Sequence, residues 1–229
     1  MRFRFSLMVL TLATVTLLAG CSVRMKNIAN TANEAIFGSP DISLTSQEIA
    51  DLPYAAIYFK ADEKPQVVAV LDRATDAQRV FRTAGEEAFI TRYGRIIASS
   101  GMQGLPLYTS GWENDPLGCY VAQTAQAEPE QDCPGVWQRT VEFGNYGSNQ
   151  LHQVKVQSTF QKSGTQNYQH PDGTPLTVTE IIETGEANGE SFTNRFLAVK
   201  GRVVFAKHYL SENLGYGSLS EIKPYMGDL

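Results

Sequence analysis

Short runs of β-branched and aromatic residues, several of them alternating with polar residues, occupy most of the chain after residue 53. Ten such runs lie at 54–59, 66–71, 79–83, 88–93, 95–98, 137–143, 151–160, 176–183, 192–199 and 202–210. Turn residues separate them at hairpin-like spacing, which is typical of an antiparallel sheet. No strand–helix alternation of the kind found in doubly wound folds accompanies them. We therefore predict one mainly β domain, whose single antiparallel sheet is strongly curled into a barrel-like or sandwich form.

Helical signals are few, and two or three short helices are expected. The sequence Thr-Ser-Gln-Glu at 45–48 has the form of a capping box and predicts a short helix through residue 50. Ser-Leu-Ser-Glu at 218–221 has the same form and predicts a last short helix that ends near Pro224. Residues 101–135 are rich in Gly, Pro, Asp and Asn and predict an irregular connection.

The N-terminal residues have the three parts of a bacterial lipoprotein signal. Arg2 and Arg4 form a positive region, and the apolar run at 5–18 is short for a membrane-spanning helix. The run ends in a lipobox formed by Leu18, Ala19, Gly20 and Cys21. We predict that residues 1–20 are a signal peptide and that the Cys21 thiol is lipidated. The alternatives are an uncleaved anchor and an ordinary signal peptide with an incidental cysteine.

Lipidation would make the membrane a partner of the mature chain through its N-terminal acyl chains. Three acyl chains exceed the two signals that stable anchoring needs. Residues 21–44 would then be a tether and residues 45–229 a single β-rich periplasmic domain. Ser22 stands where an aspartate would retain an enteric-type lipoprotein in the inner membrane, which favours the outer membrane, with the domain facing the periplasm.

The predicted export makes a disulfide between the two other cysteines plausible, and loss of the signal peptide changes the net charge. Because the periplasm is oxidising, Cys119 and Cys133 are expected to form a disulfide across a polar loop. Two reduced thiols or a metal pair are the alternatives. The net charge of −5 becomes −7 without the signal peptide, and no long basic run is present, so nucleic acid is not an expected partner.

No catalytic motif with useful specificity is found, so neither an enzymatic activity nor a cofactor or metal site is predicted. The three histidines, His152, His170 and His208, are scattered and are interpreted as surface or hydrogen-bonded residues. Glu180 and Glu183 could be considered as a glycosidase pair. Three residues apart on a strand, they would point to opposite faces, and we interpret them as solvated edge charges.

The aromatic residues leave open the possibility of sugar binding by ring stacking. Trp112, Trp137 and several tyrosines could stack on sugar rings at the surface. The competing interpretation, which we favour, is that these side chains fill a β core or pair across strands.

Three segments resemble the YjbF family of outer-membrane lipoproteins, which includes the group 4 capsule lipoprotein GfcB. Residues 52–57 are similar to the opening strand of that family, and residues 93–102 resemble its Gly-Arg stretch followed by a hydroxyl-Gly-apolar step. Residues 193–203 resemble its late Asn-x-Phe block. The family motif therefore falls on Gly94, Arg95, Gly101, Asn194 and Phe196, for which a structural role is favoured over a binding role.

The resemblance implies a non-enzymatic accessory role in making or exporting capsule or exopolysaccharide. It also implies periplasmic and outer-membrane secretion proteins as partners. Direct contact with the polysaccharide through surface aromatic residues is the alternative function.

Overall fold

The strands of this protein form one sheet. The computed structural model describes residues 40–85, 87–126, 132–144 and 150–228. Within them the strands are β1 (Ala56–Ala61), β2 (Val67–Thr75), β3 (Gln78–Arg82), β4 (Ala88–Arg92), β5 (Arg95–Ser100), β6 (Tyr108–Thr109), β7 (Val136–Gly144), β8 (Leu151–Gln169), β9 (Pro175–Ala187), β10 (Glu190–Val199), β11 (Arg202–Ser211) and β12 (Gly215–Lys223). The helices are α2 (Ser46–Asp51) and α3 (Leu117–Ala122), with 3-10 turns η1 (Trp112–Asn114), η2 (Gln123–Ala125) and η3 (Met226–Asp228).

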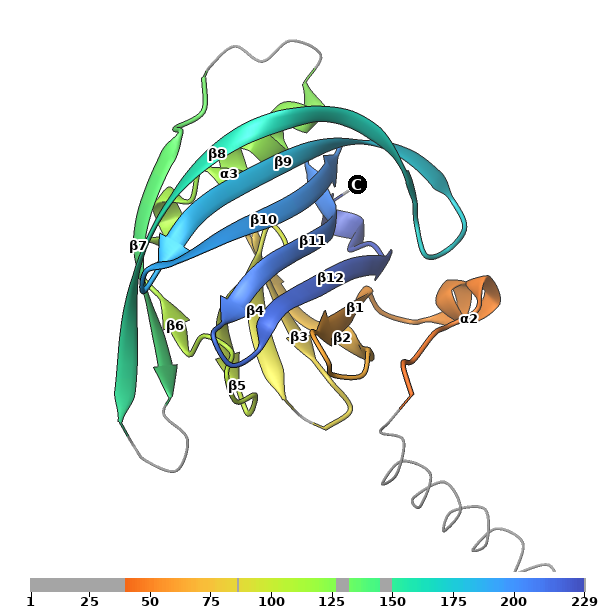
Figure 1. Cartoon of the computed structure of the whole chain (residues 1–229). Helices are drawn as coiled ribbons and strands as arrows, with labels where there is room; N and C mark the ends of the chain where they lie inside the picture. The colour runs from red at the N-terminus through yellow and green to blue at the C-terminus, as the bar shows by residue number, and fades with distance from the viewer. Residues whose placement is uncertain (1–39, 86, 127–131, 145–149, 229) are drawn as a thin grey trace, which may run out of the picture. The chain divides into compact units, whose positions relative to one another are not determined.

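The sheet is antiparallel throughout and curls into a nearly closed barrel (Figure 1). Its order is β5-β4-β3-β2-β1-β12-β11-β10-β9-β8-β7-β6, so the first and last strands pair in the middle. The two edge strands come close together, and the Ser99 hydroxyl at the end of β5 donates a 2.7 Å hydrogen bond to the carbonyl of Pro106, before β6. The predicted mainly β, strongly curled, barrel-like sheet is confirmed.

All ten predicted strands are present, but two expectations for the remaining segments were wrong. Residues 218–221 belong to β12 instead of a last helix. This strand lies between β1 and β11, and hydrogen bonding on both sides outweighs the weak strand propensity of its glycines and serines. Residues 101–135 are also more regular than predicted, because they contain β6, η1, α3 and η2.

Large apolar side chains fill the interior of the barrel. One cluster includes Phe59, Phe81 and Phe89, and the ring centroid of Phe89 lies 5.2 Å from that of Phe59 and 5.9 Å from that of Phe81. In a second cluster, α3 lies against the concave side of the sheet and buries Leu117 and Val121 against aromatic side chains of β7, β8 and β10. A helix inside the curve of the sheet therefore completes the core.

Helix α2 packs on the outer side, where its ends are held by side chains. The Thr45 side chain accepts from the Glu48 backbone and the Glu48 side chain accepts from the Thr45 backbone, so the predicted capping box is present. Ile49 is the buried residue of the helix and joins Tyr58 and other residues of β1 and β12. At the other end, the Lys223 ammonium donates to the backbone carbonyls of Ala50 and Leu52.

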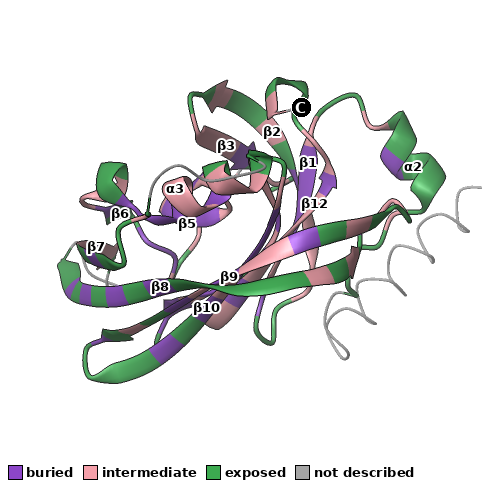
Figure 2. Ribbon diagram, turned by 90° about the horizontal axis from the view of Figure 1, so that it is seen from above, coloured by how far each residue is buried: buried purple, intermediate pink, exposed green. Residues whose placement is uncertain are grey.

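The β8–β9 hairpin is much longer than its neighbours and arches over the barrel (Figure 1). The first half of β8 alternates buried and exposed residues, whereas its second half is mostly exposed (Figure 2). Near the tip, Tyr168, Leu176 and Val178 join an apolar cluster with Leu197 and Phe205 of β10 and β11. The tip of the hairpin therefore packs against β10 and β11.

Candidate functional site: a buried charge cluster beside a cavity

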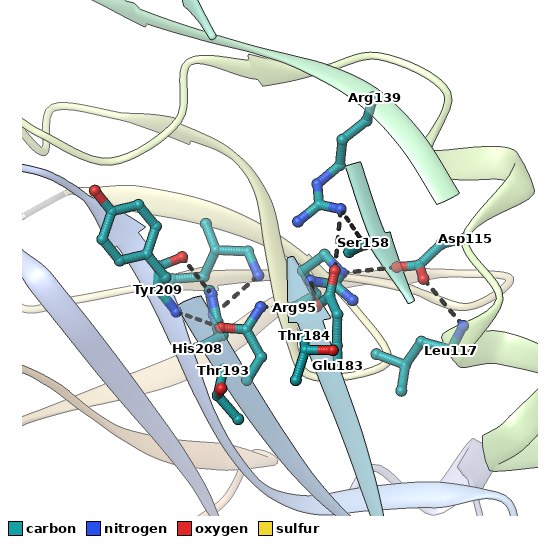
Figure 3. A network of polar contacts seen from close by, with 12 residues as sticks. Arg95, Asp115, Leu117, Arg139, Ser158, Glu183, Thr184, Thr193, His208 and Tyr209 are labelled. Atoms are coloured by element: carbon teal, nitrogen blue, oxygen red, sulfur yellow. Dashed lines mark hydrogen bonds and ion pairs between the residues drawn. The ribbon is translucent and has the colours of Figure 1, made fainter. Parts of the chain in front are cut away.

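Two arginines and two carboxylates form an ion-pair cluster inside the barrel (Figure 3). Arg95 donates from Nε to Asp115 Oδ2 and from Nη1 to Glu183 Oε2, both at 2.7 Å. Arg139 Nη1 lies 3.0 Å from Glu183 Oε1 and donates to the Ser158 hydroxyl at 3.0 Å. The four charged side chains are at most 7% exposed, and their formal charges cancel.

Polar side chains of β10 and β11 complete the cluster. Asn194 donates from Nδ2 to Glu183 Oε2 at 2.7 Å, and its Oδ1 accepts from the backbone of Tyr209 at 2.7 Å. His208 Nε2 accepts from the backbone N–H of Ile96 at 3.4 Å. The cluster therefore ties β5, β7, β9, β10 and β11 to the segment before α3.

Burial and ion pairing shift the titration of these groups. Burial alone would raise the pKa of Glu183, but the charges of Arg95 and Arg139 outweigh it and lower this pKa to about 2. Burial, and then the charge of Arg95, lowers the pKa of His208 to about 3. Burial is also the main reason why the pKa of Arg139 falls to about 10. At neutral pH Glu183 is therefore ionised, Arg139 is charged and the His208 imidazole is uncharged.

The residues of the predicted family motif are divided between this cluster and its surroundings. Arg95 and Asn194 are members, and the Arg95 guanidinium carbon lies 5.0 Å from the centre of the Phe196 ring. Gly94 precedes Arg95 with φ +75°, and a Cβ there would lie 2.8 Å from Val203 Cγ1. Gly101 lies apart, with φ +79° and Glu87 as its neighbour.

Glu183 corrects one expectation from the sequence. Glu180 and Glu183 do occupy opposite faces, but Glu183 is fully buried between two arginines and is not a solvated edge charge. Glu180 forms its ion pair with Arg195, whose side chain is 42% exposed. An alternating strand pattern assigns residues to faces, and it does not say which face carries buried partners.

The two tryptophans differ in their exposure. Trp137 is 3% exposed, and the guanidinium carbons of Arg95 and Arg139 lie 4.9 Å and 4.0 Å from its ring centre. Trp112 is half-buried, with the Arg92 guanidinium carbon 4.9 Å from its ring centre. Trp137 fills the core, as the favoured interpretation of the aromatic residues expects.

The three histidines differ in burial and in their partners. His152 is exposed, while His170 is buried near the tip of the β8–β9 hairpin and pairs with Asp172 at 2.8 Å. His208 belongs to the charge cluster. Within the described ranges, no group of three or more His, Cys, Asp or Glu residues could hold a metal ion.

The cysteines and the N-terminal motif stand apart from the cluster. Cys119 of α3 and Cys133 form a disulfide. Leu18, Ala19, Gly20 and Cys21 lie outside the described residues, so the predicted lipidation remains a prediction. Over the part of the chain that the structure covers, no helix has the length and apolar character to cross a membrane.

Asp115, Arg139 and Ser158 were not predicted as functional residues, although all three are members of the cluster. Asp115 had a usable signal, because an aspartate before Pro116 and an apolar run is typical of a helix start. Its Oδ1 accepts from the backbone N–H of Leu117 at 3.0 Å. Arg139 and Ser158 have no comparable local signal, since their strands look like ordinary half-exposed strands.

A cavity of about 280 Å³ lies beside the cluster. Arg95, Arg139, Asn194 and His208 line its polar part, and side chains of β7, β8 and β10 line its apolar part. A second cavity of about 360 Å³ is lined by residues such as Phe81, Val203 and Tyr225. The charge cluster therefore both braces the barrel and forms part of a cavity wall.

Comparison with known proteins places the chain in a family. Residues 29–219 match the model described as "Group 4 capsule polysaccharide lipoprotein gfcB, YjbF". The chain belongs to the YjbF family. The match includes the charge cluster and confirms the resemblance seen in the sequence.

Relatives of known sequence or structure agree with this assignment. The chain is 27% identical over 198 residues to the uncharacterized lipoprotein YjbF of Escherichia coli K12, covering 85% of this chain and 87% of the relative. It is 25% identical over 100 residues to the uncharacterized lipoprotein GfcB of the same organism, covering 44% and 47%. The crystal structure of the hypothetical lipoprotein YmcC from Escherichia coli K12 has the same fold, with a TM-score of 0.67 at 19% identity, covering 85% of this chain and 95% of that chain.

Proposed function

We propose that this protein is a non-enzymatic accessory lipoprotein of capsule or exopolysaccharide production or export. It acts at the outer membrane, faces the periplasm and works through protein partners in polysaccharide secretion. The observation that carries the proposal is the match of residues 29–219 to a capsule lipoprotein family. The lipobox that ends in Cys21 supports the membrane anchor.

The state of the buried charges supports a non-enzymatic role. Glu183 is held by two arginines and an asparagine, and Asp115 by Arg95 and a backbone N–H. A general acid or base needs a pKa near the working pH. The pKa values of about 2 for Glu183 and about 3 for His208 are far below neutrality. These groups are suited to holding the barrel together.

Exposed apolar side chains near β6 support contact with protein partners. Leu107 and Tyr108 are 41% and 46% exposed, and Leu151 at the start of β8 is 60% exposed. A Cβ on Gly144, which pairs with Leu151, would lie 3.4 Å from Leu107, so Leu107 and Leu151 neighbour one another, and Tyr108 is the next residue after Leu107. Exposed apolar groups that cluster beside a sheet edge are typical of interaction surfaces.

Genetic removal tests the role, and site-specific crosslinking tests the partner contact. An in-frame deletion should reduce surface polysaccharide, and the wild-type gene should restore it better than the Cys21→Ser variant. A photoreactive amino acid at Tyr108 should give adducts with secretion proteins in native membranes. The same group at Tyr54, which is 62% exposed on another part of the surface, is the matched control. Unchanged polysaccharide, or equal adducts from both positions, would contradict the proposal.

Direct contact with the polysaccharide is the second candidate function. An open groove over β7 to β10 is lined by amide and hydroxyl side chains, including Gln138, Gln157, Thr159 and Thr184. Such groups suit sugar hydroxyls, although the buried Trp137 offers no stacking surface. If the protein binds the polymer, Gln157→Ala should weaken binding of purified polysaccharide and Trp137→Phe should not. Equal binding by wild type and Gln157→Ala would count against this groove.

A further inference from the structure

The cavity of about 280 Å³ beside the charge cluster has the chemistry of a ligand site. We infer that it binds a small amphiphile with a carboxylate head and an unbranched apolar tail. The head would meet the guanidinium groups of Arg95 and Arg139, and the tail would lie along the apolar wall. This inference does not depend on the proposed role in polysaccharide secretion.

The apolar wall is formed by one side-chain cluster. Val141, Val154, Val156, Ala187 and Phe192 make up a buried cluster of the barrel, and all five line the cavity. Each is at most 7% exposed. An alkyl chain placed against them would leave water for an apolar surface, at about 25 cal/mol for each Å² buried.

The polar end of the cavity is lined by hydrogen-bond donors and not by carboxylates. Arg95 and Arg139 line the cavity, whereas their carboxylate partners Asp115 and Glu183 do not. The Arg95 side chain is 4% exposed, and its Nη2 has no hydrogen-bond partner among the described residues. A ligand carboxylate that met a guanidinium group of the cavity wall would gain a charge-assisted hydrogen bond.

The other polar groups at this end are already occupied or uncharged. Both ends of the Asn194 amide are used, by Glu183 and by the backbone of Tyr209. His208 accepts from Ile96 and stays neutral, because its pKa is lowered to about 3. The two arginines are therefore the groups left to recognise a ligand head.

The acidic groups of the cavity lie at its exposed mouth. Glu190 and Glu212 line the cavity, and both are exposed. Tyr209 donates from its hydroxyl to Glu190 at 3.3 Å. Because solvent screens these charges, they oppose a carboxylate at the buried end only weakly, and they disfavour the bound orientation that places the head at the mouth.

The size of the cavity limits the ligand. About 280 Å³ lies at the lower end of the range of about 300 to 1,000 Å³ that is usual for small-molecule sites. That space suits one short alkyl chain and excludes a whole phospholipid or a folded peptide. Decanoate is therefore a suitable probe.

Calorimetric titration can test the inference on the complete mature chain. Secretion behind an ordinary signal peptide with Cys21→Ser removes lipidation, so that no competing detergent is needed. Decanoate should bind saturably with one site per chain. Decanol, which has the same tail, and acetate, which has the same head, should each bind about tenfold or more weakly. No saturable binding of decanoate would overturn the site, and equal binding of decanol would overturn recognition of the head.

Two cavity-filling variants locate the site. Val154→Trp projects into the cavity and should reduce decanoate affinity about tenfold or more. Val136→Trp is the matched control, because Val136 is 56% exposed on β7 and does not line the cavity. If Val154→Trp fails to show a cooperative thermal transition, Ala187→Leu fills the same wall with a smaller group. Unchanged affinity in a folded cavity-filling variant would place binding elsewhere and overturn the inference.

Discussion

Arg95 and Glu183 lie 88 residues apart in the sequence, and their side chains form a 2.7 Å ion pair in the barrel interior. Both side chains are almost completely buried. Burying charges is expensive unless each charge finds partners, and here Asp115, Arg139 and Asn194 provide them. The pair therefore makes the stability of the barrel depend on a few specific residues.

Glu183→Gln should destabilise the protein strongly. The substitution leaves Arg95 and Arg139 buried beside a neutral amide, and loss of one partner of a buried ion pair costs about 3 to 5 kcal/mol. Urea unfolding followed by tryptophan fluorescence measures the change. Glu180→Gln is the control, because the side chain of its partner Arg195 is 42% exposed and a solvent-accessible pair contributes about 1 kcal/mol or less. Equal losses would mean that the cluster adds no special stability.

His208 should make the folded state less stable as the pH falls from about 6.5. The unfolded imidazole takes up a proton near its ordinary pKa of 6.5, whereas the folded imidazole stays neutral down to about pH 3. Stability contributed by this group therefore falls by about 1.4 kcal/mol for each pH unit. Urea unfolding of wild type and His208→Gln between about pH 7 and about pH 4 measures the difference, since glutamine has no such protonation. Parallel pH profiles would contradict the buried, neutral state of His208.

Gly94→Ala should lower stability by about 2 kcal/mol or more. Gly94 has φ +75°, and the added Cβ would lie 2.8 Å from Val203 Cγ1, so both strain and overlap are introduced. Gly135→Ala is the matched control, because nothing lies within 4 Å of its added Cβ. The two thermal unfolding midpoints should differ clearly. Similar midpoints would show that the turn before Arg95 tolerates a side chain.

Removal of the disulfide should cost about 3 kcal/mol in the chain-entropy model. Cys119 and Cys133 are separated by 14 residues, and the bond restricts the unfolded chain over that loop. The double variant Cys119→Ser, Cys133→Ser should unfold at lower urea concentration than wild type. Reductant should lower the wild-type midpoint similarly, and the Cys21→Ser variant should respond as wild type does. Two free thiols in denatured, unreduced protein would contradict the bond.

Local patterns predicted most of the regular structure. The ten strands are visible because β-branched and aromatic runs are separated by turn residues at hairpin spacing. The capping box of Thr45 and Glu48 involves residues only three apart, so its hydrogen bonds form within one turn of helix α2. Strand β12 was not predicted from the sequence, because its glycines and serines have weak strand propensity. It is stabilised by pairing with β1 and β11.

The charge cluster could be predicted only in part. Arg95 and Asn194 were singled out through their family motif, but Glu183 looked like one of many strand-edge charges. Alternation along β9 places residues 180 and 183 on opposite faces without saying which face is interior. Asp115, Arg139 and Glu183 come from three separate segments, and nothing in their spacing indicates that they meet.

The sequence by itself determined ten of the twelve described strands, the short helix α2, the candidate lipid signal at Cys21 and the pairing expectation for Cys119 and Cys133. These depend on neighbouring residues, on period-two alternation or on short motifs. Only the tertiary structure decided that Glu183 is buried, that Trp137 is a core residue and that a cavity exposes two arginines without their carboxylates. The physical reason is that burial and ion pairing depend on contacts between strands far apart in the chain, which appear only when the sheet curls and closes.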